Sequence, residues 1–302
     1  MEDMITGLCP QCGHTLHIPA ELASFSCMYC GARLTKKQLA AEPLAAPEVD
    51  EDRAAYYDRA VSRLGWCIKN FGGYQKKIMR DVFFEAFETY EAGCAPVIQE
   101  LARGVAPEQQ TQLLERAAAA MLDELEAGWQ KKGDMEGEKI VLAIFFVPMV
   151  RKQQLPISEE FVTILQKQWV ERYPKSPFYL GDYESISGGF RKKFLGLCFI
   201  TTAVCQELGK PDDCEELTAF RAFRDGYLSS QPDGEALIRE YYNIAPGIVT
   251  CINTCSDRHA SYARIRAEYL APCYQDLLAG RNESCKARYV RMVRDLEREY
   301  LS

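Results

Sequence analysis

The clearest pattern in this chain is a helical repeat of apolar side chains that begins near Arg53. From there, apolar residues recur at intervals of three or four, at positions 57, 60/61, 64, 67/68 and 71, and form a stripe along one face of a helix. The pair Gly72–Gly73 follows directly and ends the pattern. The spacing therefore predicts a helix from about residue 53 to residue 71.

The same spacing predicts four more helices, over about residues 78–101, 107–129, 138–153 and 158–169. Pro107 suits the first turn of its helix, and we expect Ser158 to cap the helix that follows it. Pro148 is expected to kink its helix or end it early, because proline lacks the N–H group that a helix interior uses.

A break in the pattern follows at Tyr173–Pro177, and we expect irregular chain from there to Gly189. The alternation of β-branched and polar residues that is typical of strands is missing from the chain after residue 53. The sequence therefore predicts an all-α helical body.

The first 35 residues follow a different pattern, built on two Cys-x-x-Cys pairs. Cys9 and Cys12 form the first pair, Cys27 and Cys30 the second, and fourteen residues separate the pairs. Zinc prefers four ligands in a tetrahedron and binds thiolate sulfur well, and a two-residue gap lets a tight turn point both sulfurs inward. The pattern predicts a small zinc ribbon of short β-hairpins that binds one structural Zn²⁺.

Four cysteine ligands leave no open coordination position, which is typical of a structural rather than a catalytic site. Gly13 and Gly31 each follow a cysteine pair, where such a turn often needs a positive φ. His14 and His17 lie within the ribbon, but the cysteines already satisfy the metal. Because so small a segment buries little apolar surface, its folding is expected to depend on the metal.

Residues 36–52 separate the ribbon from the helical part, are rich in alanine, proline and acidic residues, and lack aromatic residues. This composition is typical of a linker. For a chain of 302 residues we therefore expect a zinc ribbon at 1–35, a linker at 36–52, a helical middle domain at 53–186 and a second helical domain at 187–302. The fold class is mainly α.

Composition and charge narrow the classes of function. The net charge is −7 and the pI is near 5.3, so the chain as a whole lacks the excess of basic residues that is typical of a nucleic-acid binder. The longest apolar run, Ile140–Val150, is too short to cross a membrane, and the start of the chain lacks the apolar run of a secretory signal. We therefore expect a cytoplasmic protein whose thirteen cysteines are metal ligands, core residues or reactive thiols rather than disulfides.

A second notable segment begins at Cys198 with CFITTAVC, continues with PDDCEELTAFRAFRDGYL from Pro211, and includes GEALIREYYNIAP from Gly234. Here the chain resembles the bacterial CFI-box C-terminal domain family, whose pattern is similar to C-F-I-x-T-A, then E-L-x-x-h-R-x-F-R-D with h apolar, then a helix with Y-Y-x-x-x-P. The matching positions are Cys198, Phe199, Ile200, Thr202, Ala203, Glu216, Leu217, Arg221, Phe223, Arg224, Asp225, Tyr241, Tyr242 and Pro246. Together with the N-terminal ribbon, the chain resembles a subgroup of hypothetical proteins from gut Firmicutes.

The resemblance extends over most of the chain and is strongest from about residue 160 onward. It implies no particular reaction, because no activity is established for the family. Many family members carry tyrosine and glycine where this chain has Cys205 and Gln206. If the family shares one chemistry, Cys198 is therefore a better candidate for its centre than Cys205.

The residues of the box are typical of helices with polar groups between apolar ones. Asp212 or Asp213 is placed to cap a helix, and Arg221 and Asp225 lie four residues apart and can pair on one face. The polar residues Glu216, Arg221, Arg224, Asp225, Tyr241 and Tyr242 are either register-fixing ion pairs or the walls of a pocket for an anionic group.

Two further hypotheses rest on cysteines. Cys198 follows the basic run Arg191–Lys193 and lies near a helix start, two features that lower a thiol pKa, so it is a candidate nucleophile. Its base would have to be His259, the only histidine outside the ribbon. Alternatively, a second metal site would use Cys198, Cys205, Cys214, Cys251 and Cys255, although their spacing matches no familiar metal motif.

The closed ribbon and the lack of an evident catalytic set favour a zinc-binding, non-enzymatic scaffold. We expect its ribbon to dock on a protein partner rather than on nucleic acid, and we expect no membrane association. The alternatives are a cysteine-dependent enzyme or redox protein that uses Cys198, or a second metal site in the box.

Overall fold

The structure, a computed structural model, describes residues 4–12, 14–39, 50–191 and 198–302. The chain divides into two compact units, Met1–Asp52 and Arg53–Ser302. The expected fold class is confirmed, because short β-hairpins surround four cysteines in the first unit and the described part of the second unit contains helices and no strand. Among the described residues, no helix is both long and apolar enough to cross a bilayer.

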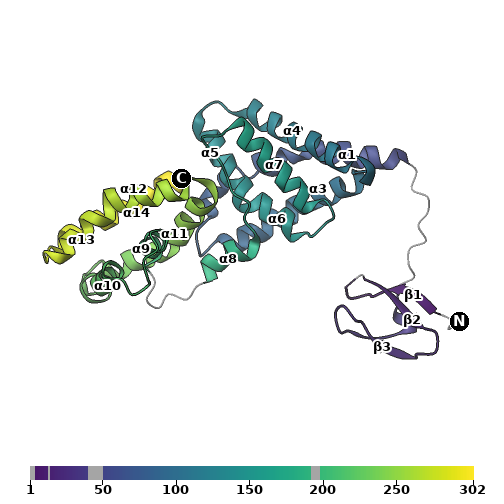
Figure 1. The fold of residues 1–302 in the computed structure, drawn as a ribbon, viewed down its shortest axis with the longest axis horizontal. Helices are drawn as coiled ribbons and strands as arrows, with labels where there is room; N and C mark the ends of the chain where they lie inside the picture. The colour runs from purple at the N-terminus through teal and green to yellow at the C-terminus, as the bar shows by residue number, and fades with distance from the viewer. Residues whose placement is uncertain (1–3, 13, 40–49, 192–197) are drawn as a thin grey trace. The chain divides into compact units, whose positions relative to one another are not determined.

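Residues 4–39 of the first unit, as far as the structure describes them, form two antiparallel hairpins and a 3-10 turn (Figure 1). They are β1 (Met4–Leu8) with β2 (Thr15–Pro19), β3 (Ser24–Ser26) with β4 (Arg33–Thr35), and η1 (Lys36–Gln38). Leu16 of the first hairpin and Leu34 of the second pack with Cys9 and Cys27 in a separate small core. So few apolar side chains leave much of the stability of this unit to the cysteines.

Helices occupy the segments whose apolar stripes predict them. They are α1 (Asp50–Leu64), α2 (Trp66–Lys69), α3 (Phe83–Gly104), α4 (Gln110–Gly128), α5 (Lys132–Val141), α6 (Val147–Lys152) and α7 (Ser158–Arg172), with the 3-10 turns η2 (Tyr74–Lys77) and η3 (Pro107–Gln109). The stripe residues Leu64, Phe87, Met121 and Leu165 are all buried. The helical repeat therefore predicts both the position and the inward face of these helices.

The segment around Pro148 remains helical but changes its hydrogen-bond pattern before the proline. After α5 the chain forms a π turn, η4 (Leu142–Phe146), and then α6, with Pro148 in the first turn. Because proline has no N–H to donate to the preceding turn, the wider π spacing accommodates it without ending the helix.

The C-terminal part of the chain is also helical. Its elements are α8 (Tyr183–Arg191), α9 (Phe199–Glu207), α10 (Glu215–Ala222), α11 (Gly234–Cys255), α12 (Arg258–Ile265), α13 (Ala271–Leu278) and α14 (Asn282–Tyr300), with the π turns η5 (Phe223–Tyr227) and η7 (Arg266–Leu270) and the 3-10 turn η6 (Leu228–Ser230). The expectation of irregular chain up to Gly189 is wrong, because α8 begins at Tyr183. The carboxylate of Asp182 accepts hydrogen bonds from the N–H and the hydroxyl of Ser185, each at 2.8 Å, and so caps this helix. The predicted domain boundary at 186/187 falls inside α8 and stays a prediction.

Helix α11 joins the two halves of the body. It packs against α9, α12 and α14 and also against α5, α8 and η4. A single core of buried side chains extends from Tyr57 to Leu301. Figure 1 shows α9 to α14 gathered at one end of the body and α1 to α7 at the other. The box residues on α11 are therefore anchored by helices from both halves.

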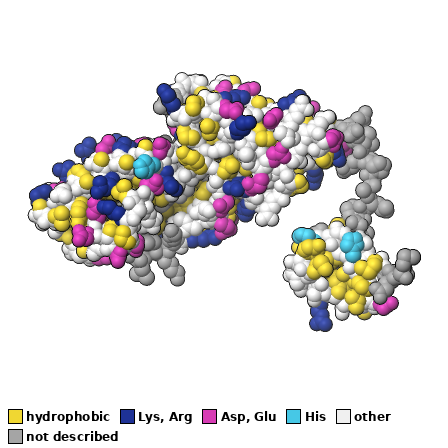
Figure 2. Space-filling view, in the orientation of Figure 1, with side chains coloured by type: hydrophobic (Ala, Val, Ile, Leu, Met, Phe, Trp, Pro, Cys, Tyr) yellow, Lys and Arg dark blue, Asp and Glu magenta, His cyan; other side chains and the backbone are white. Residues whose placement is uncertain are grey.

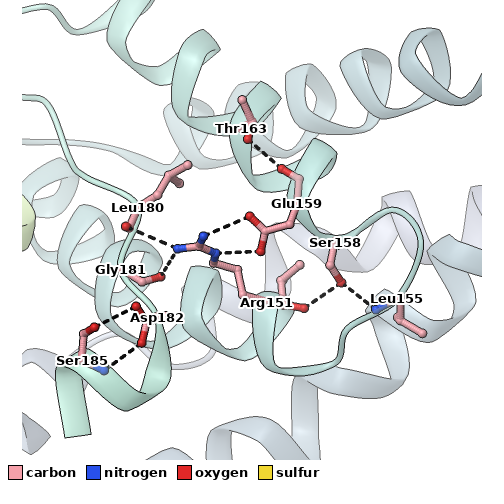
Figure 3. A network of polar contacts seen from close by, with 10 residues as sticks. Arg151, Leu155, Ser158, Glu159, Thr163, Leu180, Gly181, Asp182 and Ser185 are labelled. Atoms are coloured by element: carbon pink, nitrogen blue, oxygen red, sulfur yellow. Dashed lines mark hydrogen bonds and ion pairs between the residues drawn. The ribbon is translucent and has the colours of Figure 1, made fainter. Parts of the chain in front are cut away.

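A polar network ties the segment before α8 to α6 and α7 (Figure 3). The Nε and Nη2 atoms of Arg151 donate to the two carboxylate oxygens of Glu159 at 2.9 and 3.0 Å, and Nη1 donates to the carbonyl of Gly181 at 3.1 Å. The Ser158 hydroxyl donates to the carbonyl of Val150 at 2.8 Å. Ser158 therefore closes the turn between α6 and α7 instead of capping α7 as expected.

Candidate functional site

The two hairpins of the ribbon each place one cysteine pair in a tight turn. The N–H of Cys9 donates to the carbonyl of His14 at 3.0 Å, and the N–H of Cys27 donates to the carbonyl of Ala32 at 2.8 Å. Gly31 has φ +75°, the left-handed conformation expected after the second pair. Gly13, for which the same conformation is expected, lies outside the described residues.

The four cysteine sulfurs form a compact cluster. The Sγ atoms of Cys9 and Cys30 lie 3.8 Å apart, those of Cys12 and Cys27 lie 3.7 Å apart, and all four lie within 4.8 Å of one another. A tetrahedral ion with metal–sulfur bonds of about 2.3 Å places its ligand sulfurs roughly 3.8 Å apart. The cluster therefore has the dimensions of a four-thiolate metal site, whereas sulfurs joined in a disulfide lie about 2.05 Å apart.

Other potential ligands in the ribbon have different neighbours. The ring of His14 stacks on that of Tyr29 with centroids 4.3 Å apart, and Nδ1 of His17 lies 3.0 Å from the hydroxyl oxygen of Thr6. Within the described ranges, the four cysteines are the one group of three or more His, Cys, Asp or Glu side chains placed to hold a metal ion. The site is thus a four-cysteine site, as its spacing predicts.

The local electrostatics favour charge at one of these thiols. Burial acts to raise the pKa of Cys27, but hydrogen bonds from the backbone N–H groups of Cys30 and Tyr29 and the neighbouring thiols outweigh it and lower that pKa to about 6. At Cys12 a backbone hydrogen bond at His14 acts to lower the pKa, but burial and the adjacent sulfurs raise it to about 12. Several thiolates this close together repel one another, and a bound cation would offset that repulsion.

A second cluster forms where the box segments meet. Cys198 occupies the N-cap position of α9 and is buried, and its Sγ lies 3.5 Å from Nη1 of Arg224. The same nitrogen donates to the hydroxyl of Tyr242 at 3.0 Å. Arg224 also donates from Nε and Nη2 to the two carboxylate oxygens of Asp225 at 2.6 and 2.7 Å. Side chains from α9, η5 and α11 therefore meet at one guanidinium.

Tyrosine hydroxyls continue this cluster on its buried side. The hydroxyl of Tyr241 accepts from the N–H of Ile200 at 3.0 Å and lies 3.4 Å from the hydroxyl of Tyr289, which in turn lies 3.1 Å from that of Thr201. The motif contains neither Thr201 nor Tyr289, so reasoning from the box missed both. The signal for Tyr289 is its place on the buried stripe of α14, which also carries Cys285, Met292 and Leu296 at helical spacing.

The cluster borders a small cavity of about 50 Å³. Its polar lining consists of Cys198, Arg224, Tyr241, Tyr289 and the ion pair Glu240–Arg294, and the remaining wall consists of apolar side chains of α10, η5, η6, α11 and α14. Arg224 is already bonded to Asp225 and Tyr242, so its charge is neutralised inside the cluster rather than presented to an anion.

Two of the expected pocket residues belong elsewhere. Glu216 forms ion pairs with Lys210 and with Arg266, the latter at 3.3 Å. Arg221 donates from Nη2 to both carboxylate oxygens of Asp212 at 2.9 and 3.0 Å. The expected Arg221–Asp225 pair is wrong, because the π turn η5 begins between these residues and disrupts the four-residue register of an α-helix.

The structure also corrects the expected chemistry of Cys198. Burial raises the pKa of its thiol, although Arg224 and Arg221 act in the opposite direction. The expectation of a lowered pKa is therefore wrong. Arg191 pairs with Glu184, and the lysines at 192 and 193 lie outside the described residues.

His259 is not placed to act as the base for Cys198. Its Nδ1 lies 3.5 Å from Glu207 at the C-terminal end of α9, whereas Cys198 caps the N-terminal end. The nine residues of α9 rise about 1.5 Å each, so the two ends are roughly 13 Å apart. The expected nucleophile–base pair is therefore not formed.

The five cysteines of the second-metal hypothesis do not converge. Cys205 and Cys214 lie side by side with their Sγ atoms 3.7 Å apart. The thiol of Cys198 faces Arg224, and that of Cys251 donates to the carbonyl of Tyr300 at 3.6 Å. These cysteines are therefore divided between separate parts of the C-terminal half.

Similarity to known proteins adds no further assignment. No protein-family model, no curated protein and no solved structure matches this chain.

Proposed function

We propose that the ribbon binds one structural zinc ion through Cys9, Cys12, Cys27 and Cys30. The observation that carries this proposal is the pair of sulfur–sulfur distances, 3.8 and 3.7 Å, which match the edge of a tetrahedral zinc–thiolate site. Four thiolates fill the coordination sphere, so the ion stabilises the fold of the ribbon and has no position for a substrate.

We further propose that the metal-bound ribbon docks on a protein partner. Met28 and Tyr29 lie between the ligands Cys27 and Cys30, and 80% and 58% of their respective surfaces are exposed. Figure 2 shows hydrophobic side chains gathered on the visible face of the ribbon, close to its histidines. Large exposed apolar side chains near a rigid metal-held turn are typical of a protein-binding surface.

The charge of the chain supports a protein rather than a nucleic acid as this partner. Neutralising phosphates needs a concentration of lysine and arginine, whereas the net charge of this chain is −7. We propose the helical body as the scaffold that carries the ribbon. The meeting of Cys198, Arg224 and Tyr242 in one cluster supports a structural role for the box motif. We propose membership of the CFI-box family on the resemblance of the box residues alone.

Two measurements test this function. Metal analysis of the purified full chain is expected to give one zinc per chain, and the substitutions Cys9→Ser and Cys12→Ser are expected to abolish it. Zinc retained in the double variant would overturn the metal assignment.

The docking surface is tested by cross-linking and affinity capture from native cells with the full chain. A variant carrying Met28→Ser and Tyr29→Ser is expected to retain its zinc and lose the captured protein. Leu22→Ser is the matched control, because Leu22 is also exposed but lies in the turn between the hairpins. Equal capture by all three proteins would exclude the proposed surface while leaving the zinc site intact.

A further inference from the structure

The turn between α9 and α10 brings two cysteines together. Cys205 lies in the last turns of α9, and Cys214 occupies the N-cap position of α10. Between them Gly209 adopts φ +67°, and the N–H of Lys210 donates to the carbonyl of Cys205 at 2.9 Å. This tight reversal holds the two Sγ atoms 3.7 Å apart.

We propose that Cys205 and Cys214 are a redox modification site that forms a reversible disulfide when the protein meets a hydroperoxide. A disulfide bond is about 2.05 Å long, so the sulfurs, now 3.7 Å apart, have a gap of about 1.7 Å to close. Rotation of a cysteine side chain about its Cα–Cβ bond moves the sulfur on this scale.

The exposure of the two residues assigns their order of reaction. Cys214 is partly exposed, whereas Cys205 is 2% exposed. Burial and the neighbouring Cys214 raise the pKa of Cys205 to about 12, which keeps this thiol protonated and slow to attack an oxidant. Cys214 therefore meets the peroxide first, and Cys205 resolves the product.

The chemistry balances with the peroxide as the only oxidant. The Cys214 thiolate attacks one peroxide oxygen, forming an S–O bond while the O–O bond breaks and the second oxygen leaves as water after taking a proton. The Cys205 sulfur then attacks the sulfenic sulfur, the S–S bond forms, and the S–O bond breaks with release of a second water. Two thiols lose two electrons and two protons in total, and hydrogen peroxide is reduced to two waters.

Other adjacent cysteines of the body lack this access. Cys273 and Cys285 are neighbours, with the thiol of Cys273 3.9 Å from the carbonyl of Cys285, but both are completely buried. They are therefore an internal control, because they are neighbouring cysteines with no exposed thiol.

Oxidation of the Cys205–Cys214 pair would fix the position of α9 relative to α10. The turn between them contains Asp212, whose carboxylate accepts hydrogen bonds from Arg221. Arg221 lies on α10, three residues before Arg224 of the box cluster. A disulfide across the turn fixes Asp212 and therefore restricts motion at the junction of α9 and α10.

The test uses the full zinc-loaded chain treated with hydrogen peroxide, blocked with an alkylating reagent after unfolding, and examined by peptide mass spectrometry with fragmentation. We expect the peptide that carries both cysteines to lose two hydrogens and to escape alkylation at Cys205 and Cys214. The linked fraction should exceed that of Cys273–Cys285 by at least about tenfold, because oxidation follows exposure. Reduction with a thiol reagent before blocking should restore alkylation at both Cys205 and Cys214.

Two variants separate this mechanism from general oxidation. Cys214→Ser should leave Cys205 reduced, and serine suits the N-cap position, so folding should be retained. Cys205→Ser should leave a sulfenic acid on Cys214 that a dimedone probe captures. The proposal is overturned if Cys205 and Cys214 stay reduced while the ribbon cysteines oxidise, if Cys205 oxidises equally in the Cys214→Ser variant, or if the disulfide forms with Cys198 instead.

Discussion

The Sγ atom of Cys198 lies 3.5 Å from Nη1 of Arg224, and this nitrogen also donates to the hydroxyl of Tyr242. Cys198 and Tyr242 belong to different helical segments, yet the guanidinium of Arg224 contacts both. Because burial raises the pKa of the Cys198 thiol, the Arg224 guanidinium donates a hydrogen bond to a protonated thiol and not to an activated thiolate. The cluster therefore links α9, η5 and α11 and stabilises their packing.

Arg224→Lys is expected to lower the free energy of unfolding by about 1–3 kcal/mol. A lysine ammonium cannot donate hydrogen bonds to Cys198, Tyr242 and Asp225 at the same time, as the guanidinium does. Asp225 is 64% exposed, so most of the loss should come from the buried contacts and little from the ion pair. Urea unfolding followed by circular dichroism measures the change. Arg221→Lys is the matched control and should cost less than about 1 kcal/mol, because its partner Asp212 is exposed. Equal losses in the two variants would contradict a special role for Arg224.

Gly247→Ala is expected to destabilise the body by more than about 2 kcal/mol. A Cβ atom at Gly247 would lie 1.8 Å from the carbonyl oxygen of Ile78, so α11 would have to move away from the segment before α3. Gly188→Ala in α8 is the control, because a Cβ there meets nothing within 4 Å and alanine favours a helix by up to about 1 kcal/mol. Thermal unfolding should rank Gly188→Ala at or above the wild type and Gly247→Ala well below it. The reverse order would show that α11 is not closely packed at Ile78.

The helical body is expected to lose stability at alkaline pH. Burial raises the pKa of Cys198, Cys251 and Tyr241, so the folded protein retains protons that the unfolded chain releases. This contribution is complete below the unfolded thiol pKa of about 8.5 and is lost as pH rises from there through the folded values. The urea midpoint of the helical signal should therefore fall between about pH 8 and pH 10. A constant or rising midpoint would contradict the burial of these groups.

Removing the metal is expected to unfold the ribbon and leave the helices intact. The ribbon has its own small core and depends on its cysteine cluster, whereas the body has a separate, extensive core. After treatment with a strong chelator, protease cleavage should increase within residues 4–39, while the circular dichroism signal of the helices should stay constant. A large loss of helical signal would show that the two units depend on each other for folding.

The sequence determined the features that depend on local spacing. Two cysteine pairs with a two-residue gap predict two metal-binding turns, because the geometry of each turn is set by a few adjacent residues. Apolar stripes with a helical period predicted α1, α3, α4 and α7, because the period itself fixes which face of a helix is buried. Neither inference requires knowledge of a distant partner.

Only the tertiary structure decided which polar residues meet. Arg224 joins Cys198 while Arg221 turns to Asp212, because a π turn inserted after Ala222 changes the direction of the side chains that follow it. The burial that raises the pKa of Cys198, and the reversal that places Cys205 beside Cys214, also come from packing between helices. Such contacts depend on how helices distant in the chain fit against one another, which local periodicity does not specify.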